Sequence, residues 1–384
     1  MTYRGWITAR EAIRALGVKP ATLYSYASRG MVRTLHGGGR TKLYSADDVA
    51  RLCARRDAAR GHAAAAAGAL RWGPPVLDSA ITEIRLDGPY YRGRNAIALA
   101  QRETRFDEVA WWLWTGLPGT LPKAAPDAAE LAQLARHVEA GMPPWLRLAA
   151  ALPWLVRVEG PPGGPADERR AGAWLLRTLV GALSLPDVER AASAAAAPTL
   201  AAGLALAIGA VDGATRWINR ALVLCADHEL NASAFTARVA ASADASLHAA
   251  VGAALYTLSG DRHGGGTRHA EAFVAGQVST VDAGFGHPLY PQGDPRAPPL
   301  LEALPADHPV HRSLTRAEAR GRRPNVDLGL AAVAQRAGAP GGTAAALFAI
   351  GRCAGWIAHI LEQRTRSDLL RPRARYIGPK PTGR

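Results

Sequence analysis

The chain has 384 residues, of which 48% are apolar and 20% charged, so it can bury a sizeable core and is not wholly disordered. This length exceeds that of one ordinary domain and predicts two structural units. Three widely separated cysteines, Cys53, Cys225 and Cys353, exclude a disulfide framework and a zinc-finger spacing. The N-terminus lacks the apolar stretch of a secretory signal, so we expect a soluble, cytoplasmic protein that does not associate with membranes.

The positive charge is concentrated at the N-terminus. The formal net charge is +14, and residues 1–75 hold 13 of the basic side chains against four acidic ones. The rest of the chain is nearly balanced in charge. The basic N-terminal region is therefore predicted to bind a polyanion.

The first 60 residues predict a small domain. Thr8 is a good N-cap for a helix that ends at Gly17, with Glu11 as its capping-box partner, and Pro20 starts a second helix. A glycine-rich turn at residues 36–40 precedes a short strand at residues 42–44, and Ser45 is placed to cap a last helix over residues 46–60. Two helices with a short turn, followed by a two-stranded wing, are typical of a winged helix-turn-helix domain.

This region resembles the excisionase/MerR-type winged helix in Trp6-Ile-Thr-Ala-Arg-Glu-Ala, Leu16-Gly-Val18, Thr22-Leu-Tyr24, Ser28-Arg-Gly30 and Tyr44-Ser-Ala-Asp-Asp48. The resemblance implies binding of duplex DNA, with one set of side chains facing a groove and another on phosphates. The alternative is a domain that keeps this fold but packs on the body or on a partner. The expected DNA-binding residues are Lys19, Thr22, Tyr24 and Tyr26 in the groove, and Arg33, Arg40 and Lys42 on phosphates.

The rest of the chain has a helical pattern. Residues 61–75 are alanine-rich and end in Gly-Pro-Pro, which predicts a linker. Residues 106–114 predict an amphipathic helix closed by Gly116, and residues 344–363 keep an apolar stripe at helical spacing. The longest uncharged stretch, residues 191–211, is rich in alanine and glycine and contains Pro198, so we expect a buried alanine-rich helix there. The body is therefore predicted to be all-α.

Candidate catalytic groups lie beside glycines or in rigid turns. His263 precedes three glycines and His287 follows Gly286, which leaves each imidazole reachable. Asp327 follows a basic run, and prolines flank Arg296 and Arg371. A guanidinium in a fixed frame suits bidentate capture of a carboxylate. Two histidines, a carboxylate and paired arginines are what enolate chemistry on a polyacid requires.

Seven short motifs, in order over residues 76–379, resemble the citrate synthase family. The N-terminal two are Tyr91-Arg-Gly93, which is similar to YRG, and Phe106-Asp-Glu-Val109, which is similar to FEEVA. Next come Asp227-His-Glu-Leu-Asn-Ala-Ser-Ala-Phe235 for DHELNAS-x-F and His263-Gly-Gly-Gly for HGGA. The last three are Gly286-His287 through Asp294-Pro-Arg296 for GHxxY…DPR, Asn325-Val-Asp327 for NVD, and Arg371-Pro-Arg-Ala-Arg-Tyr376 for RPRAxY.

The resemblance implies a role for each of these residues. Asp327 would take a methyl proton from acetyl-CoA, and His263 would donate a hydrogen bond to the forming enol oxygen. His287 would polarise and protonate the oxaloacetate carbonyl. His228, Arg296 and Arg371 would hold oxaloacetate, and water would then hydrolyse the citryl thioester. No metal or further cofactor is implied, whereas His359, Glu362 and Arg238 are expected to serve packing or ion pairing.

The architecture implied is a homodimer of chains with a helical large and a helical small domain. The expected parts are a winged helix-turn-helix domain at 1–60, a linker at 61–75, a large domain at 76–263, a small domain at 264–340, and a return to the large domain at 341–384. Oxaloacetate would bind in the cleft between the large and small domains. Two DNA-binding domains in a dimer would suit two half-sites.

Two alternatives to a citrate synthase stay open. A 2-methylcitrate synthase would use propionyl-CoA, and one methylene changes discrimination by only ~1–3 kcal/mol. A metabolite-sensing regulator would bind substrate with little turnover. Pro288 and Pro291 stand where the family often has basic residues near the CoA phosphates, which favours the regulator, whereas the intact His263, His287 and Asp327 favour an enzyme.

Overall fold

The structure is a computed structural model, and it describes residues 6–36, 42–46, 48–50, 52–53, 77–156, 164–278, 284–372 and 377–379. The chain divides into two compact units, residues 1–78 with 373–384, and residues 79–372. The predicted linker at 61–75 and the predicted phosphate-binding Arg40 lie outside the described residues.

In the N-terminal unit, two helices precede a β-hairpin. Its elements are β1 (Trp6–Thr8), α1 (Ala9–Leu16), α2 (Pro20–Ser28), β2 (Thr34–His36) and β3 (Lys42–Ser45). The capping box of Thr8 and Glu11 is confirmed, and Gly17 ends α1 in the left-handed conformation with φ 58°. The strands form an antiparallel sheet in the order β1-β3-β2. Leu16, Leu23, Val32 and Tyr44 are among the buried residues of its small core.

A short sheet opens the larger unit. β4 (Thr82–Arg85), β5 (Gly88–Tyr91) and β6 (Arg94–Asn95) form an antiparallel meander. The all-α prediction is therefore too strict, because strands this short carry no readable alternation of apolar and polar residues. Gly88, with φ 125°, is the first residue of β5, directly after the tight turn of Leu86 and Asp87 that follows β4.

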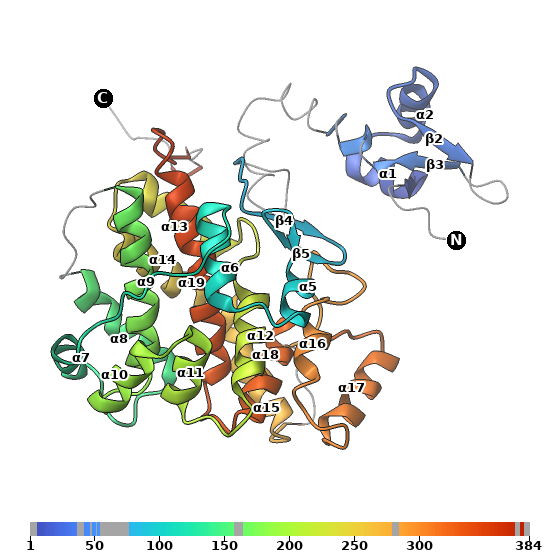
Figure 1. Cartoon of the computed structure of the whole chain (residues 1–384). Coiled ribbons are helices and arrows are strands. Elements are labelled where there is room, and N and C mark those ends of the chain that lie inside the picture. Colours follow the sequence, from blue (N-terminus) through green and yellow to red (C-terminus); the bar gives the residue numbers. More distant parts are fainter. Residues whose placement is uncertain are drawn as a thin grey trace. The chain divides into compact units, whose positions relative to one another are not determined.

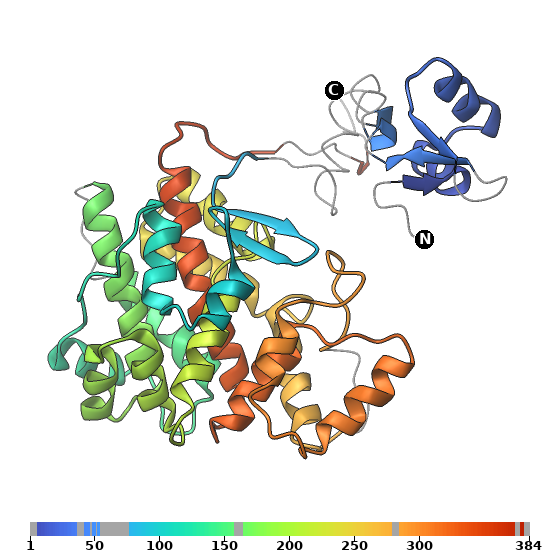
Figure 2. The ribbon, with the colours of Figure 1, turned by 45° about the vertical axis from the view of Figure 1, so that its right-hand side comes forward.

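Helices make up the rest of the larger unit (Figures 1 and 2). The earlier ones are α5 (Ala96–Gln101), α6 (Phe106–Thr115), α7 (Ala128–Ala135), α8 (Pro144–Val156), α9 (Pro165–Ala182), α10 (Val188–Ala196), α11 (Leu200–Ile208) and α12 (Thr215–Cys225). The later ones are α13 (Ala232–Ser242), α14 (Leu247–Leu258), the 3-10 turn η1 (Gly264–Gly266), α15 (Thr267–Val274), α16 (Ala297–Leu301), α17 (Val310–Ala319), α18 (Val326–Arg336) and α19 (Thr343–Gln363).

The helix α19 is the central element of this unit. It packs against α6, α8, α9, α12, α13, α14 and α18, and Figure 1 shows it in red among these helices. It is long and apolar enough to cross a membrane, but 89% of that apolar window is buried inside the protein. The expected helix at residues 344–363 is thus confirmed, and its length and hydrophobicity follow from its place in the core.

The uncharged stretch at residues 191–211 was predicted as one helix but forms parts of two. α10 ends before Pro198, and Thr199 caps α11 by accepting a hydrogen bond from Ala202 N. Proline disfavours helical geometry at the preceding residue, so the chain breaks there and restarts at the threonine.

The described part of the larger unit contains two hydrophobic cores. The main one extends from Ile81 to Ile360 and surrounds α19. A smaller one contains Ala270, Phe273, Leu314 and Leu328 and draws its members only from residues 270–332. This smaller core lies within the predicted small domain at 264–340, although the domain boundaries themselves stay a prediction.

Candidate active site

One face of α19 holds the segment from Cys225 to Ser233. Arg352 Nε donates to the carbonyl oxygen of Cys225 at 2.8 Å, and Gly355 N donates to that of Ala226 at 2.8 Å. Trp356 Nε1 donates to Ser233 Oγ at 3.0 Å. Positions 352, 355, 356 and 359 share one helical face, so this packing sets where His228 lies.

The predicted site histidine His228 is buried in a cluster of rings. Its Nε2 lies 2.9 Å from the hydroxyl of Tyr290, and its ring centroid lies 5.1 Å from that of His287. Burial, followed by the charges of Arg296 and Arg352, keeps the pKa of His228 well below its ordinary value. A neutral His228 therefore faces His287 and Tyr290.

His287 has a defined tautomer. Leu289 N donates to His287 Nδ1 at 3.2 Å, so the proton of the neutral ring sits on Nε2. Burial and the charge of Arg296 lower the pKa of His287 to about 4. The ring can thus offer an Nε2–H donor at neutral pH, as polarisation of a carbonyl requires.

The turn that carries His287 is pinned to the turn before Asp327. Gly286 N donates to the Arg323 carbonyl oxygen at 2.7 Å, and Asn325 N donates to that of Gly284 at 2.9 Å. The Asn325 side chain donates to the Gly286 carbonyl oxygen at 3.1 Å. These bonds bring two motifs 40 residues apart, Gly286-His287 and Asn325-Val-Asp327, into one place.

Asp327 lies in the first turn of α18 and is 9% exposed. Burial raises its pKa to about 7, against the opposing charge of Arg296. Its Oδ1 is buried without a hydrogen-bond partner within the described part of the chain. A buried carboxylate with one unpartnered oxygen and a pKa near neutrality suits a general base.

His263 takes part in a hydroxyl-centred network. Its Nε2 lies 2.9 Å from Ser233 Oγ, which also lies 2.7 Å from Asn231 Oδ1 and accepts from Trp356. Burial, then the charge of Arg352, lowers the pKa of His263 to about 4. No direct contact between His263 and Asp327 is seen among the residues that the structure places.

The predicted Arg296 is held rigidly, as its frame suggested. Its Nε and one terminal nitrogen donate to the two oxygens of Asp294 at 2.9 and 2.8 Å, and both side chains are buried. Asp294 also accepts from Val326 N at 3.0 Å, which ties Arg296 to the start of α18. Burial works to lower the pKa of Arg296, but Asp294 outweighs it and raises that pKa.

Sequence reasoning missed Arg352. This side chain is 1% exposed, and its charge acts on His228, His263, His287 and Asp327. Within the described ranges no carboxylate forms an ion pair with Arg352, although the charge of the buried Asp227 acts on it. Its guanidinium therefore keeps bonding capacity for an anion. An arginine in the middle of an apolar helical stripe was the available signal.

Arg371 is not brought to this cluster. It lies exposed beyond the end of α19, and no contact with the histidines is recorded for it. Its assignment to the substrate stays a prediction. The other expectations for this region are met, since Arg238 pairs with Glu362 at 2.5 Å and buried His359 lies 3.4 Å from Asp227.

The predicted DNA-binding residues differ in exposure. Lys19, Tyr24 and Lys42 are exposed, with 54% of Tyr24 accessible. Thr22 is half-buried, and Tyr26 packs against the core of the N-terminal unit. Arg33 is bound to Asp48 through Nε at 2.9 Å and a terminal nitrogen at 3.2 Å, so part of its bonding capacity is used internally.

In the described part of the chain, no group of three or more His, Cys, Asp or Glu side chains is arranged to hold a metal ion.

Comparison with known proteins shows what the chain is similar to. Residues 199–373 match the family "Citrate synthase, C-terminal domain". The body resembles the solved citrate synthase of Thermoplasma acidophilum in its ternary complex with carboxymethyl coenzyme A and oxaloacetate, with a TM-score of 0.67 at 22% identity over 80% of this chain and 95% of that one. It also resembles the Thermotoga maritima citrate synthase, with a TM-score of 0.63 at 24% identity over 81% and 96%. The body therefore has the citrate synthase fold.

Three curated relatives are similar to this chain in sequence. "Citrate synthase 2" of Bacillus subtilis is 36% identical over 187 residues, 42% of this chain and 50% of that protein. "Citrate synthase" of Haloferax volcanii is 39% identical over 191 residues, 42% and 49%. "2-Methylcitrate synthase" of Shewanella oneidensis is 32% identical over 193 residues, 44% and 52%. The chain thus spans about half the length of the curated relatives it matches, and the family match lies in its C-terminal half.

Proposed function

We propose that the chain condenses acetyl-CoA with oxaloacetate and hydrolyses the citryl thioester to citrate and CoA. The observation that carries this proposal is the buried Asp327 carboxylate, whose pKa is about 7, together with the neutral, half-buried His263 and His287. The charge of Arg352 acts on all three groups, and that of Arg296 acts on Asp327 and His287. The curated relatives named as citrate synthases support it.

Oxaloacetate would bind through charge. Arg352 has no carboxylate partner in the described region, and Arg296 keeps one terminal nitrogen beyond its two bonds to Asp294. Charge-assisted bonds from both guanidinium groups would hold the two carboxylates of the substrate. His287 Nε2–H would then donate to the ketone oxygen, with His228 beside it.

Carbon–carbon bond formation begins at the thioester. The Asp327 carboxylate takes a proton from the methyl group, and the C–H electron pair forms the enol. His263 donates a hydrogen bond to the thioester oxygen, which requires its proton on Nδ1. The Ser233 hydroxyl, which donates to Asn231 Oδ1 in this structure, must then rotate and donate to His263 Nε2 instead. The enol carbon attacks the ketone carbon, whose oxygen receives a proton by way of His287. Water then cleaves the thioester, which releases the CoA thiol.

A thiol-release assay with oxaloacetate tests this proposal. Turnover with acetyl-CoA that exceeds turnover with propionyl-CoA is the expected result. The reverse preference would favour a 2-methylcitrate synthase, an activity that the Shewanella relative's name supports. Tight binding of oxaloacetate with no thiol release from either thioester would instead favour a metabolite-sensing regulator.

We further propose that the N-terminal unit is a winged helix-turn-helix domain that binds duplex DNA in a homodimer. Its support is the order α1, α2, β2, β3, the exposed Lys19 and Tyr24 at the start and middle of α2, and the basic excess of residues 1–75. Lys42 on β3 and Arg40 would add phosphate contacts. Arg33 pairs with the buried Asp48 and so holds the hairpin against the following residues, while its own side chain is 65% exposed and would also reach a phosphate.

A further inference from the structure

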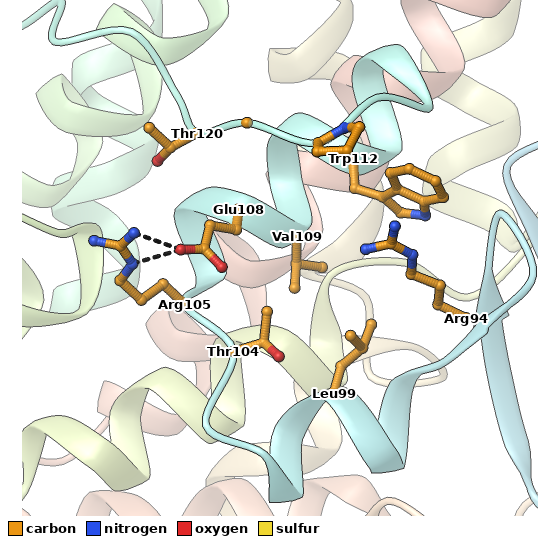
Figure 3. A pocket seen from close by; sticks show the side chains of 10 residues that line it. Arg94, Leu99, Thr104, Arg105, Glu108, Val109, Trp112 and Thr120 are labelled. Atoms are coloured by element: carbon orange, nitrogen blue, oxygen red, sulfur yellow. Dashed lines mark hydrogen bonds and ion pairs between the residues drawn. The ribbon is translucent and has the colours of Figure 1, made fainter.

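A cavity of about 380 Å³ lies on the larger unit, away from the histidine cluster. β6, α5, α6 and the segments next to them form it, and none of the predicted catalytic or substrate residues lines it. Figure 3 shows Arg94 and Trp112 at one end, Arg105 and Glu108 at the other, and Leu99 and Val109 between them. A volume of this size with an apolar floor and few polar groups is typical of a small-molecule site.

Arg94, the cation at one end of the cavity, stacks on Trp112 and forms no ion pair within the described part of the chain. The guanidinium carbon of Arg94 lies 3.6 Å from the ring centroid of Trp112, so the guanidinium stacks on the indole face. No carboxylate in the part of the chain that the structure describes forms an ion pair with Arg94. Stacking leaves the edge of a guanidinium group free to donate two parallel hydrogen bonds, which matches a carboxylate.

Charge at the other end restricts the ligand. Arg105 Nε donates to Glu108 Oε1 at 2.7 Å, so this pair is neutral as a whole. The side chains that line the cavity therefore carry a net charge of one positive unit, and the Glu108 carboxylate disfavours a dianion such as phosphate. The apolar floor of Leu99 and Val109 favours a ligand with a hydrophobic body.

Hydrogen bonds join this cavity to the segment that carries His228. Trp112 Nε1 donates to the Tyr91 carbonyl oxygen at 2.9 Å. The buried Tyr91 hydroxyl donates to the Val223 carbonyl oxygen at 3.0 Å and lies 3.4 Å from Asp227 N, which donates to it. These hydrogen bonds form a continuous series of contacts from Trp112 to the backbone next to His228, along which a shift of Trp112 would be passed on.

We propose that this cavity binds a small organic monocarboxylate with an apolar body, and that its occupancy changes the affinity for oxaloacetate. The second part rests on the proposed function, whereas the first does not. Linkage of this kind is reciprocal, so oxaloacetate must change the affinity for the carboxylate by the same factor.

The binding test uses para-fluorobenzoate, observed by fluorine NMR on the full chain. We expect saturable binding in the millimolar range, and a loss of about tenfold or more in Arg94→Gln, because a charge-assisted hydrogen-bond pair is removed. Arg102→Gln, an exposed arginine at the end of α5 that does not line the cavity, is the matched control and should bind like wild type. Acetate and benzyl alcohol, which each lack one half of the proposed ligand, should compete poorly.

Equal affinity for para-fluorobenzoate in Arg94→Gln and wild type, or no saturable binding, would overturn the proposed site.

The linkage is tested by calorimetric titration of oxaloacetate with and without saturating para-fluorobenzoate. A change in oxaloacetate affinity of threefold or more is expected in wild type and should vanish in Trp112→Phe, which keeps a ring under Arg94 but lacks the N–H. The same change in Trp112→Phe, or none in wild type, would overturn the linkage while leaving the binding result intact. Absence of any oxaloacetate binding would count against the proposed function alone.

Discussion

Gly355 and Asp227 lie so close that no side chain fits between them. A Cβ atom at position 355 would stand 2.2 Å from Asp227 Oδ1 and 2.6 Å from the Ala226 carbonyl oxygen. The glycine lets α19 approach the backbone next to His228, and its own N–H donates to Ala226. A missing side chain on one helix thereby fixes the position of a histidine on another segment.

Gly355→Ala should therefore disturb the site as well as the core. Overpacking against backbone costs about 1–3 kcal/mol of unfolding free energy, and the shift should also weaken oxaloacetate binding. Chemical denaturation with calorimetry of oxaloacetate measures both. Gly252→Ala is the matched control: a Cβ there meets nothing nearer than 3.7 Å, and alanine favours a helix by up to about 1 kcal/mol. Equal stability of the two variants would contradict this packing.

Arg352→Gln should raise the KM for oxaloacetate by a factor on the order of 10–100, because one charge-assisted contact to a carboxylate is lost. The KM for the thioester should change much less. In wild type, oxaloacetate should also raise the melting temperature, and the variant should lose that shift. Arg316→Gln, an exposed arginine on α17, is the control. An unchanged KM in Arg352→Gln would remove this arginine from the substrate site.

Activity should fall on the acid side of neutrality. Asp327 must be ionised to take a proton, and its pKa is about 7, so kcat/KM should rise with pH through about 7. The histidines are already neutral there, since the pKa values of His263 and His287 are about 4. Asp327→Asn should abolish thiol release while oxaloacetate still raises the melting temperature. An acid limb near pH 4 with no inflection near 7 would argue against Asp327 as the base.

Stability should fall in acid for a separate reason. His263 and His287 have lowered pKa values in the folded chain, so between the ordinary value of 6.5 and about 4 the unfolded state binds more protons. Their contribution is present above pH 6.5 and is lost as the pH falls toward 4, at up to about 1.4 kcal/mol per pH unit for each ring. Asp327 acts in the opposite sense, because its pKa is raised from 3.8 to about 7 and the folded state therefore binds more protons between these values. Denaturation of wild type and of a histidine variant at several pH values isolates the contribution of the histidine as the difference between the two slopes. His287→Asn should reduce the slope, whereas His137→Asn, at an exposed position, should leave the slope unchanged.

The proposed DNA binding should depend on salt and on α2. Fluorescence anisotropy of a labelled duplex with the full chain should show an affinity that falls steeply as salt rises, because counterions are released. Combined Lys19→Ala and Tyr24→Ala should weaken it, and Arg316→Ala should not. Affinity that ignores salt, or that survives the double change, would favour the alternative in which this domain packs against a partner.

Several features could be read from the sequence because they depend on local rules. The capping box of Thr8 and Glu11, the helix ended by Gly116 and the apolar stripe of α19 each follow from neighbouring residues. The motifs and their order mark His228, His263, His287, Asp327 and Arg296 as candidate site residues from the sequence alone. The short strands β4–β6 and the break at Pro198 were misjudged, since both depend on a few residues within an otherwise helical pattern.

Only the tertiary structure decided how these residues meet and what state they are in. The neutral rings of His263 and His287 and the pKa of Asp327 near 7 result from burial, which no local pattern specifies. Arg352 lies at the site because the face of α19 that carries it packs on the segment before His228. Arg371, in contrast, lies exposed. A sequence prescribes the chemical groups, but desolvation and long-range packing assign their charges and partners.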